Sequence, residues 1–326
     1  MGKLGAEEQA LLARMQAGGF KPAHQIPIEI SRAALTQMAL AMAGPKVPIE
    51  RVRDERIAGP AGDIAIRVYD QYPAERGSRG VALFFHGGGY YLGNLDTHDH
   101  VCRFLCAHAG VPVVAVDYRL APEHKFPAGL EDCYAALEWV ASHAAARGWD
   151  PTRIAVVGDS AGGTLATSVC RLARDRNGPA VAYQVAIYPG LTLDDANEFS
   201  SRREFGNGEY FLSSEDQRFF RELYLRDPER EVANPLVSPI RAPEFRGLPA
   251  TLIVAAEFDP VRDECAHYAE LLRHAGIPAE YVCFAGTIHP FFLFDGVLEA
   301  GRRGQALVAQ RIGRAIGPRP AALERN

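Results

Sequence analysis

A serine within a glycine-rich turn is the first feature of this sequence that points to chemistry. Residues 154–157 are apolar, residues 158–163 read GDSAGG, and a helical pattern follows. This is the G-x-S-x-G pattern between a strand and a helix, where a sharp turn exposes the serine hydroxyl and the glycines leave room for neighbouring backbone. Ser160 is therefore the candidate nucleophile. A phosphate-binding or purely structural turn is the alternative, but neither a P-loop lysine nor a G-x-G-x-x-G motif accompanies it.

A serine hydroxyl becomes a good nucleophile only when a base removes its proton and a carboxylate holds that base. Of the histidines that follow Ser160, only His289 stands in a predicted loop, after the last predicted strand. We therefore predict that His289 is the base. Asp259 follows the preceding predicted strand and is the candidate acid, with Glu257 as its weaker rival. The competing role for Asp259 is that of a helix N-cap, with Pro260 as the first helical residue.

Acyl transfer also needs backbone N–H groups that stabilise the negative charge developing on the reacting carbonyl oxygen. Residues 86–89 read HGGG and follow a predicted strand, and the residue after a nucleophilic serine supplies a further N–H group. The predicted donors are Gly88, Gly89 and Ala161. We expect His86 to hold this loop through hydrogen bonds rather than to transfer protons.

Aromatic residues near these segments either line an apolar pocket or belong to the core. Those predicted to line a substrate pocket are Tyr90, Tyr91, Tyr188, Phe205, Phe211 and Phe291. Residues 96–100 read DTHDH and resemble a metal cluster, but a further histidine is missing and a helix start explains them better. No metal and no cofactor is expected.

Strand and helix patterns alternate from about residue 50 onward and predict a sheet of mostly parallel strands that can bring these distant residues together. The first two strands flank a turn-rich segment and should form an antiparallel hairpin at the edge. Strands are predicted at 51–57, 64–69, 81–85, 113–117, 154–157, 182–187, 251–256 and 280–284. Helices are predicted at 98–109, 130–147, 164–174, 263–275 and 300–316.

Two segments depart from this alternation and predict a helical cap. The N-terminal segment contains helical patterns at 7–17 and 30–43. The second contains an amphipathic pattern at 213–225 that begins with SSED, in the manner of a capping box. The expected organisation is N-terminal cap helices in 1–48, a first part of the core in 49–190, a cap insertion in 191–239 and a second part of the core in 240–326.

Length and composition exclude several other classes of protein. The chain has 326 residues, of which 48% are hydrophobic and 23% charged, as in globular domains. The net charge of −5 and the absence of a basic block exclude a nucleic-acid partner. No stretch approaches the ~20 apolar residues of a membrane span, and Glu7 and Glu8 lie where a secretory signal would be apolar. We expect a soluble, cytoplasmic protein whose 6 cysteines are reduced and buried in the core.

Taken together, the motifs resemble the hormone-sensitive lipase-like family of α/β-hydrolases, which includes many bacterial carboxylesterases. The resemblance covers most of the chain and rests on HGGG at 86–89, DYRLAPEH at 117–124 with FPA at 126–128, and GDSAGG at 158–163. Further matches are YP at 188–189, SP at 238–239 and DPVRDE at 259–264. The family usually has glycine after the catalytic histidine, whereas here Pro290 precedes Phe291.

This resemblance implies an α/β-hydrolase fold with a mostly parallel, eight-stranded sheet flanked by helices and a helical cap. It implies a serine carboxylesterase that hydrolyses short- to medium-chain esters through the triad Ser160, Asp259 and His289 and an acyl-enzyme intermediate. Its partner would be a small-molecule ester, and homodimers are common in the family. The alternatives are that the triad acts on a lactone, thioester, amide or acetylated small molecule, or that the chain is a non-catalytic ligand-binding member of the fold. Because His289 is retained, the binding role is the weaker of these.

Overall fold

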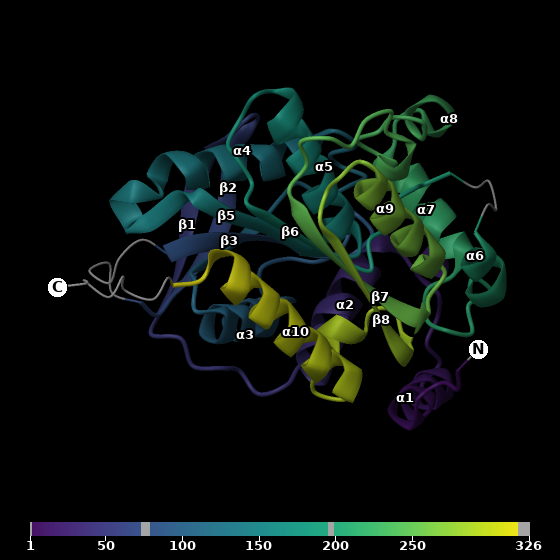
Figure 1. Cartoon of the computed structure of the whole chain (residues 1–326). Helices are drawn as coiled ribbons and strands as arrows, with labels where there is room; N and C mark the ends of the chain where they lie inside the picture. Colours follow the sequence, from purple (N-terminus) through teal and green to yellow (C-terminus); the bar gives the residue numbers. More distant parts are fainter. Residues whose placement is uncertain (1, 73–78, 195–198, 319–326) are drawn as a thin grey trace.

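An eight-stranded sheet forms the centre of the molecule, as a computed structural model shows (Figure 1). The structure describes residues 2–72, 79–194 and 199–318, so parts of all four predicted segments, 1–48, 49–190, 191–239 and 240–326, lie outside it. The strand order is β1-β2-β4-β3-β5-β6-β7-β8. The strands are β1 (Arg51–Gly59), β2 (Gly62–Asp70), β3 (Arg79–Phe85), β4 (Val113–Asp117), β5 (Trp149–Asp159), β6 (Tyr183–Ile187), β7 (Ala250–Phe258) and β8 (Ala279–Ile288).

The direction of the strands confirms the predicted sheet. β1 and β2 form an antiparallel hairpin at one edge, and β2 also pairs antiparallel with β4. Each of the remaining pairs, from β4–β3 to β7–β8, is parallel. The carboxyl ends of β3 to β8 therefore meet at one edge of the sheet, which is where ligands bind in open α/β sheets.

Helices cover both faces of the sheet, as the alternation predicted. α3 (Asp99–Ala109) and α10 (Glu299–Ile316) pack together on one face, and α4 (Ala128–His143) and α5 (Ala161–Asp175) on the other (Figure 1). α9 (Arg262–His274) packs along β7 and β8. Successive side chains of β3 alternate between the two cores, with Leu83 and Phe85 on the side of α4 and Phe84 on the side of α3.

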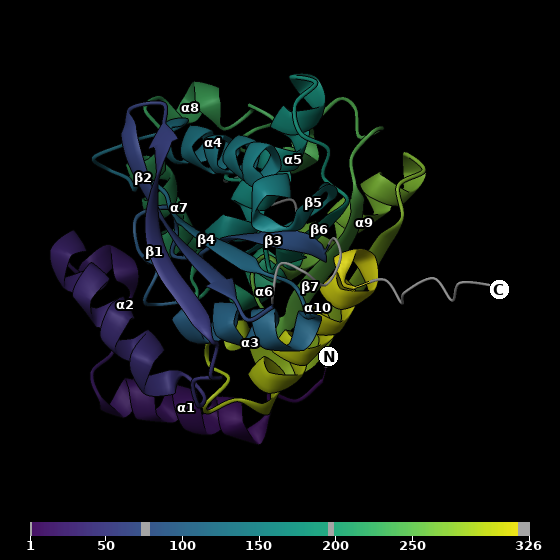
Figure 2. The same ribbon diagram turned by 90° about the vertical axis from the view of Figure 1, so that its left-hand side faces the viewer.

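The segments that departed from the alternation form further helices outside the sheet. The N-terminal segment contains α1 (Ala6–Ala17) and α2 (Ile28–Met42), which lie beside each other in Figure 2. The second segment contains α6 (Ser200–Phe205), α7 (Ser214–Tyr224) and α8 (Pro228–Glu231). The predicted capping box is present at the start of α7, because the Ser213 hydroxyl accepts from the Asp216 N–H group and the Asp216 carboxylate accepts from that of Ser213.

The two segments contact each other and the core through specific polar groups. Asp216 accepts hydrogen bonds from the backbone N–H group of His24, at 3.2 Å, and lies 2.9 Å from the His24 ring. Arg32 of α2 pairs with Glu123 at 2.7 Å. α2 is thereby attached to the loop that follows β4. Among the helices of the described part of the chain, none is both long enough and apolar enough to cross a membrane.

The structure corrects two expectations about individual residues. The competing role of Asp259 as a helix N-cap is not observed, because α9 begins at Arg262 and its N-cap residue is Val261. The six cysteines are free thiols, but only five are buried. Cys283 on β8 is exposed, since it lies on an edge strand where side chains of one face reach solvent.

Candidate active site

Ser160 stands between β5 and α5 with an unusual backbone conformation. Its φ of 52° and ψ of −124° place it in a region that L-residues rarely adopt. The turn tolerates this only because its neighbours are small: a Cβ atom at Gly158 would collide with the Gly162 carbonyl, and one at Gly162 with the Phe85 carbonyl. The backbone N–H group of Ser160 donates to the Ile187 carbonyl at 2.8 Å. The serine is thus held rigidly at the carboxyl edge of the sheet.

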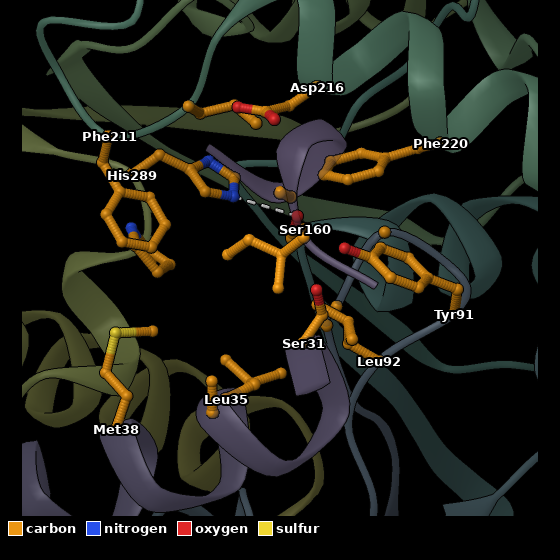
Figure 3. A pocket seen from close by; sticks show the side chains of 18 of the residues that line it. Ser31, Leu35, Met38, Tyr91, Leu92, Ser160, Phe211, Asp216, Phe220 and His289 are labelled. Atoms are coloured by element: carbon orange, nitrogen blue, oxygen red, sulfur yellow. Dashed lines mark hydrogen bonds between the residues drawn. The ribbon is translucent and has the colours of Figure 1, made fainter. Parts of the chain in front are cut away.

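The structure brings Ser160, His289 and Asp259 together. His289 Nε2 lies 2.9 Å from Ser160 Oγ (Figure 3), and His289 Nδ1 lies 2.8 Å from Asp259 Oδ2. The Asp259 side chain is fully buried, and its other oxygen accepts from the Val261 N–H group at 3.1 Å. With the Nδ1 proton directed at the carboxylate, Nε2 is left to accept the serine proton. This arrangement can activate Ser160 as a nucleophile.

Glu257, the rival acid, is occupied elsewhere. One of its carboxylate oxygens accepts from the Gly2 N–H group at 2.7 Å and the other from that of Gly286 at 2.8 Å. These hydrogen bonds lower the pKa of Glu257. The carboxylate therefore connects the N-terminal segment to the end of β8 rather than to His289.

Backbone N–H groups border Ser160 at the predicted oxyanion positions. Gly87, Gly88 and Gly89 line a cavity beside Ser160, and Ala161 lines a second one with Gly89. In the part of the chain that the structure describes, no hydrogen-bond acceptor is found for the N–H groups of Gly88, Gly89 and Ala161. Gly88 and Gly89 have φ values of 125° and 57°, which glycine adopts without strain. The three groups are thus available to a substrate oxygen.

A buried network of polar contacts around Asp159 stabilises the HGGG loop. The Asp159 carboxylate accepts from the Gly87 N–H group at 2.9 Å and lies 3.1 Å from His98 Nε2. Burial alone would raise the pKa of Asp159, but the adjacent His98 ring and the Gly87 N–H group hold it below its usual value. Burial and the neighbouring His98 lower the pKa of His86 to about 4, so that ring is neutral and suited to a structural role. As expected, His86 forms a hydrogen bond within the loop, 2.8 Å from the Gly87 carbonyl.

Two cavities meet at Ser160 and His289. The larger has a volume of about 610 Å³ and the smaller about 40 Å³, and both are lined by Ser160, His289 and Phe220. Figure 3 shows the larger cavity with α2 along one side. Its wall includes Ser31, Leu35, Met38, Leu92, Phe211, Asp216 and Leu293. An ester carbonyl placed at Ser160 would thus have an apolar space on one side and a small space on the other.

The structure separates the predicted aromatic residues into two groups. Tyr91 and Phe211 line the larger cavity, and Tyr90 lines the smaller. Tyr188, Phe205 and Phe291 line neither cavity and are fully buried in the core. Tyr188 packs behind the base, with its ring centre 4.4 Å from that of His289. Adjacency in the chain to a site residue did not distinguish pocket walls from core.

Several lining residues were missed by sequence reasoning. Ser31, Leu35 and Met38 of α2 recur at intervals of four and three, which is the signal of one helix face. Phe220 lies on α7, which was predicted as an amphipathic helix, but the sequence did not show that this side chain faces the cavity. The spacing in α2 could have identified a buried face, although not what that face would contact.

The side chains of residues 96–100 take part in other interactions. His98 pairs with Asp159, and Asp99 pairs with Arg103 at 2.9 Å. Within residues 2–72, 79–194 and 199–318, no three side chains of the metal-binding types gather closely enough to hold an ion. The segment leads into α3, which begins at Asp99.

Comparison with known proteins identifies relatives over most of the chain. Residues 82–293 match a family model described as alpha/beta hydrolase fold. The chain is 43% identical over 269 residues to the carboxylic ester hydrolase LipN of Mycobacterium tuberculosis, a match covering 81% of this chain and 70% of that protein. It is 39% identical to the carboxylesterase NlhH of the same organism, covering 91% of this chain and 89% of that protein.

Solved structures show the same similarity in three dimensions. A hyperthermophilic esterase from the archaeon Pyrobaculum calidifontis has a TM-score of 0.90 at 39% identity, covering 96% of this chain and 98% of that chain. A thermostable esterase from Pseudomonas putida has a TM-score of 0.89 at 31% identity, with the same coverage of 96% and 98%. The similarity therefore includes the segments outside the sheet as well as the sheet itself.

Proposed function

The chain belongs to the α/β-hydrolase family, in the hormone-sensitive lipase-like group of bacterial carboxylesterases, and from this we propose that it is a serine carboxylesterase. The observation that carries the proposal is the continuous chain of contacts from Ser160 Oγ to His289 at 2.9 Å and from His289 to Asp259 at 2.8 Å. These residues are proposed to act as nucleophile, base and orienting acid. The relatives named as ester hydrolases and esterases support the reaction class.

In the proposed reaction, His289 Nε2 takes the proton of Ser160 as Oγ attacks the carbonyl carbon of an ester. The carbonyl oxygen becomes negatively charged and accepts hydrogen bonds from Gly88, Gly89 and Ala161. The tetrahedral intermediate collapses, and His289 gives its proton to the departing alcohol. Water then attacks the acyl-enzyme with His289 again as base, which releases the carboxylic acid and restores the Ser160 hydroxyl.

The helices outside the sheet are proposed to form a cap that limits the length of the substrate's acyl chain. α2 lies along the larger cavity, and α7 supplies Phe220 to both cavities. The apolar walls and limited volume favour an acyl chain of short to medium length, roughly C4 to C8. Long-chain triglyceride emulsions should accordingly be poor substrates.

We also propose that the protein acts in the cytoplasm as a homodimer. β8 ends the sheet, with α10 beside it, and within the described residues it pairs only with β7. An edge strand with one unpaired side can pair with a second copy. Size-exclusion chromatography with light scattering tests this, and a mass equal to the 35.5 kDa of one chain at all concentrations would contradict it.

The activity is tested with p-nitrophenyl esters from C2 to C16. Wild type should hydrolyse them with a maximum at short to medium chains, and Ser160→Ala should be inactive while keeping its thermal unfolding midpoint. Ser142→Ala, which changes an exposed serine of α4, is the matched control and should retain activity. EDTA should leave the rate unchanged, because the proposed steps need no metal. Undiminished hydrolysis by Ser160→Ala would refute the proposal.

If neither wild type nor Ser160→Ala hydrolyses these esters, labelling with a fluorophosphonate probe distinguishes an activated serine with another substrate from an unreactive serine. Labelling of wild type but not of Ser160→Ala would show an activated serine with a different substrate, such as a lactone, thioester or amide. No labelling of either would favour a ligand-binding role on the same fold.

A further inference from the structure

Two hydroxyl groups lie in the wall of a cavity that is otherwise almost entirely apolar. They belong to Ser31 of α2 and to Tyr91, which follows the HGGG loop. Figure 3 shows both oxygens directed toward the same part of the larger cavity, on the side of Ser160. The two residues come from segments that are far apart in the sequence, so only the docking of α2 brings them together.

Both hydroxyls are shielded from bulk water, and the contact they make with each other is of poor hydrogen-bond geometry. Tyr91 is 0% and Ser31 6% exposed. Within the described part of the chain, neither Tyr91 Oη nor Ser31 Oγ has a hydrogen-bond partner of good geometry. Buried polar atoms in native proteins are almost always hydrogen-bonded, and leaving one unpaired destabilises the fold. An unpaired couple beside a reactive serine is therefore explained best by a ligand that pairs with it.

The couple is held in place by interactions that do not use the hydroxyls. Arg32, next to Ser31, donates from Nε to the Tyr91 carbonyl at 2.9 Å and pairs with Glu123 at 2.7 Å. The Tyr91 ring packs against Phe220, with ring centres 5.5 Å apart. A site whose groups are fixed before binding loses little entropy when the ligand arrives.

Both groups are uncharged at neutral pH. Burial raises the pKa of Tyr91 to about 12, and the adjacent Ser31 hydroxyl opposes part of that rise. A neutral hydroxyl can donate one hydrogen bond and accept others. Together the two groups suit a single oxygen atom of a substrate, whether that oxygen accepts only or also donates.

The charged residues at the same cavity do not replace the two hydroxyls as partners. Lys21 also lines the cavity, but it is exposed to solvent. Asp216 is the acidic residue of α7 that lines the larger cavity, but its oxygens already accept from the Ser213 N–H and hydroxyl groups and from the His24 N–H group. Its carboxylate is therefore committed to the contact between α7 and the N-terminal segment. The two neutral hydroxyls, in contrast, have no well-aligned partner in the described part of the chain.

We propose that Ser31 and Tyr91 form a polar subsite that binds an uncharged oxygen, as in a hydroxyl, keto or ether group, on the ester substituent that occupies the larger cavity. This rests on the proposed esterase function and names its substrate class: esters whose longer substituent is oxygenated rather than plain alkyl. An all-carbon chain would offer neither hydroxyl a well-aligned partner, so it would bind less well although the same residues would cleave it.

The test compares esters that differ only by replacement of one CH₂ group with oxygen. Vinyl octanoate and its oxa-analogues vary the acyl side, and octyl acetate and its oxa-analogues vary the alcohol side. In each series only one substituent is long, so it must take the larger cavity. At one chain position wild type should prefer the oxa-ester about three- to tenfold in kcat/KM, the range expected of one or two neutral hydrogen bonds. The preference should come mainly from KM.

Tyr91→Phe and Ser31→Ala should each reduce this ratio toward one. Each variant's own rate on the all-carbon esters is the reference, so a general effect of the substitution on binding in the cavity cancels in the ratio. Tyr183→Phe, at the opposite end of the sheet from the site, is the matched control for loss of a phenol hydroxyl and should keep the wild-type ratio. The proposal is overturned if wild type shows no oxa-preference at any position in either series, or if both variants keep it. Failure of the esterase function would look different, because the all-carbon esters would then also resist hydrolysis.

Discussion

The imidazole of His289 lies 2.8 Å from the carboxylate of Asp259 because the strands that precede these residues are paired at their last positions. Phe258 of β7 is the register partner of Ile288 of β8, so the next residue of each strand emerges at the same height on the carboxyl edge of the sheet. The acid and the base are thus placed by strand register rather than by the loops that follow.

Replacement of Asp259 by asparagine should lower kcat by about 10³- to 10⁴-fold, because an amide cannot hold the His289 tautomer that accepts the serine proton. The measurement is hydrolysis of p-nitrophenyl butyrate together with thermal unfolding, which should show a folded variant. Glu257→Gln serves as the comparison and should lose less than tenfold. An equal loss in both variants would remove the distinction between acid and rival.

Replacement of Asp159 by alanine should weaken the HGGG loop. The Gly87 N–H group and His98 would lose their common buried partner, which should lower the free energy of unfolding by about 3 kcal/mol. We also expect kcat to fall about 10- to 100-fold and a boronic acid inhibitor to bind correspondingly less tightly. Asp96→Ala, which removes a mostly exposed carboxylate that pairs with Arg67, should change little. Unchanged inhibitor affinity in Asp159→Ala would show that the loop does not depend on this network.

The buried carboxyl of Glu264 predicts a pH dependence of stability. Burial raises its pKa from 4.5 to about 7, although Arg202 and the Thr192 N–H group oppose the rise and the charge of Asp259 adds to it. The folded state then holds a proton that the unfolded state has released, so this group's contribution to the free energy of unfolding falls as pH rises from about 4.5 to about 7. The slope is at most about 1.4 kcal/mol per pH unit.

Urea unfolding of wild type and Glu264→Gln between pH 5 and pH 8 measures this effect. The difference between the two proteins should change in favour of the variant as pH increases, since glutamine does not titrate. A difference that is constant over the whole range would mean that Glu264 has an ordinary pKa.

The number of exposed cysteine thiols can be measured by their reaction with a thiol reagent. Cys283 is exposed and the other five thiols are buried, so a thiol reagent such as DTNB should react quickly with one equivalent in the native protein and with six after unfolding in urea. Cys283→Ser should abolish the fast reaction. Two or more fast equivalents in wild type would show that a buried cysteine is transiently accessible.

The local sequence pattern predicts the bounds of a strand correctly where all of its residues share the same surroundings. The apolar run at 113–117 predicts β4 at its observed bounds, because it is buried among neighbours on both faces. β5 extends further than its pattern, starting at Trp149 ahead of the predicted Ile154. The additional residues include polar ones, and Trp149 is placed in the sheet by pairing with Arg79, which periodicity does not reveal.

For the candidate site, the sequence predicts the triad residues but not the walls of the cavity. Motif and chain order predicted Ser160, Asp259 and His289 at strand ends, and the sheet brings those ends together. The cavity walls were not predictable in the same way, since they depend on how α2 and α7 dock. Tyr188 and Tyr91 both follow site-forming strands, yet one packs behind the base and the other faces the cavity. Their direction is set by packing partners from distant parts of the chain.

Phe220 of α7 borders both cavities at Ser160. This ring and Leu212 therefore lie between the two compartments around the reacting carbonyl, while the residues proposed to carry out the reaction belong to strand ends of the core. Substitution at this position would merge or resize the two compartments without displacing Ser160, His289 or Asp259. The range of esters that the protein accepts can therefore change independently of its catalytic residues. A single substitution in α7 would alter which substituents fit, while the reaction centre stays the same.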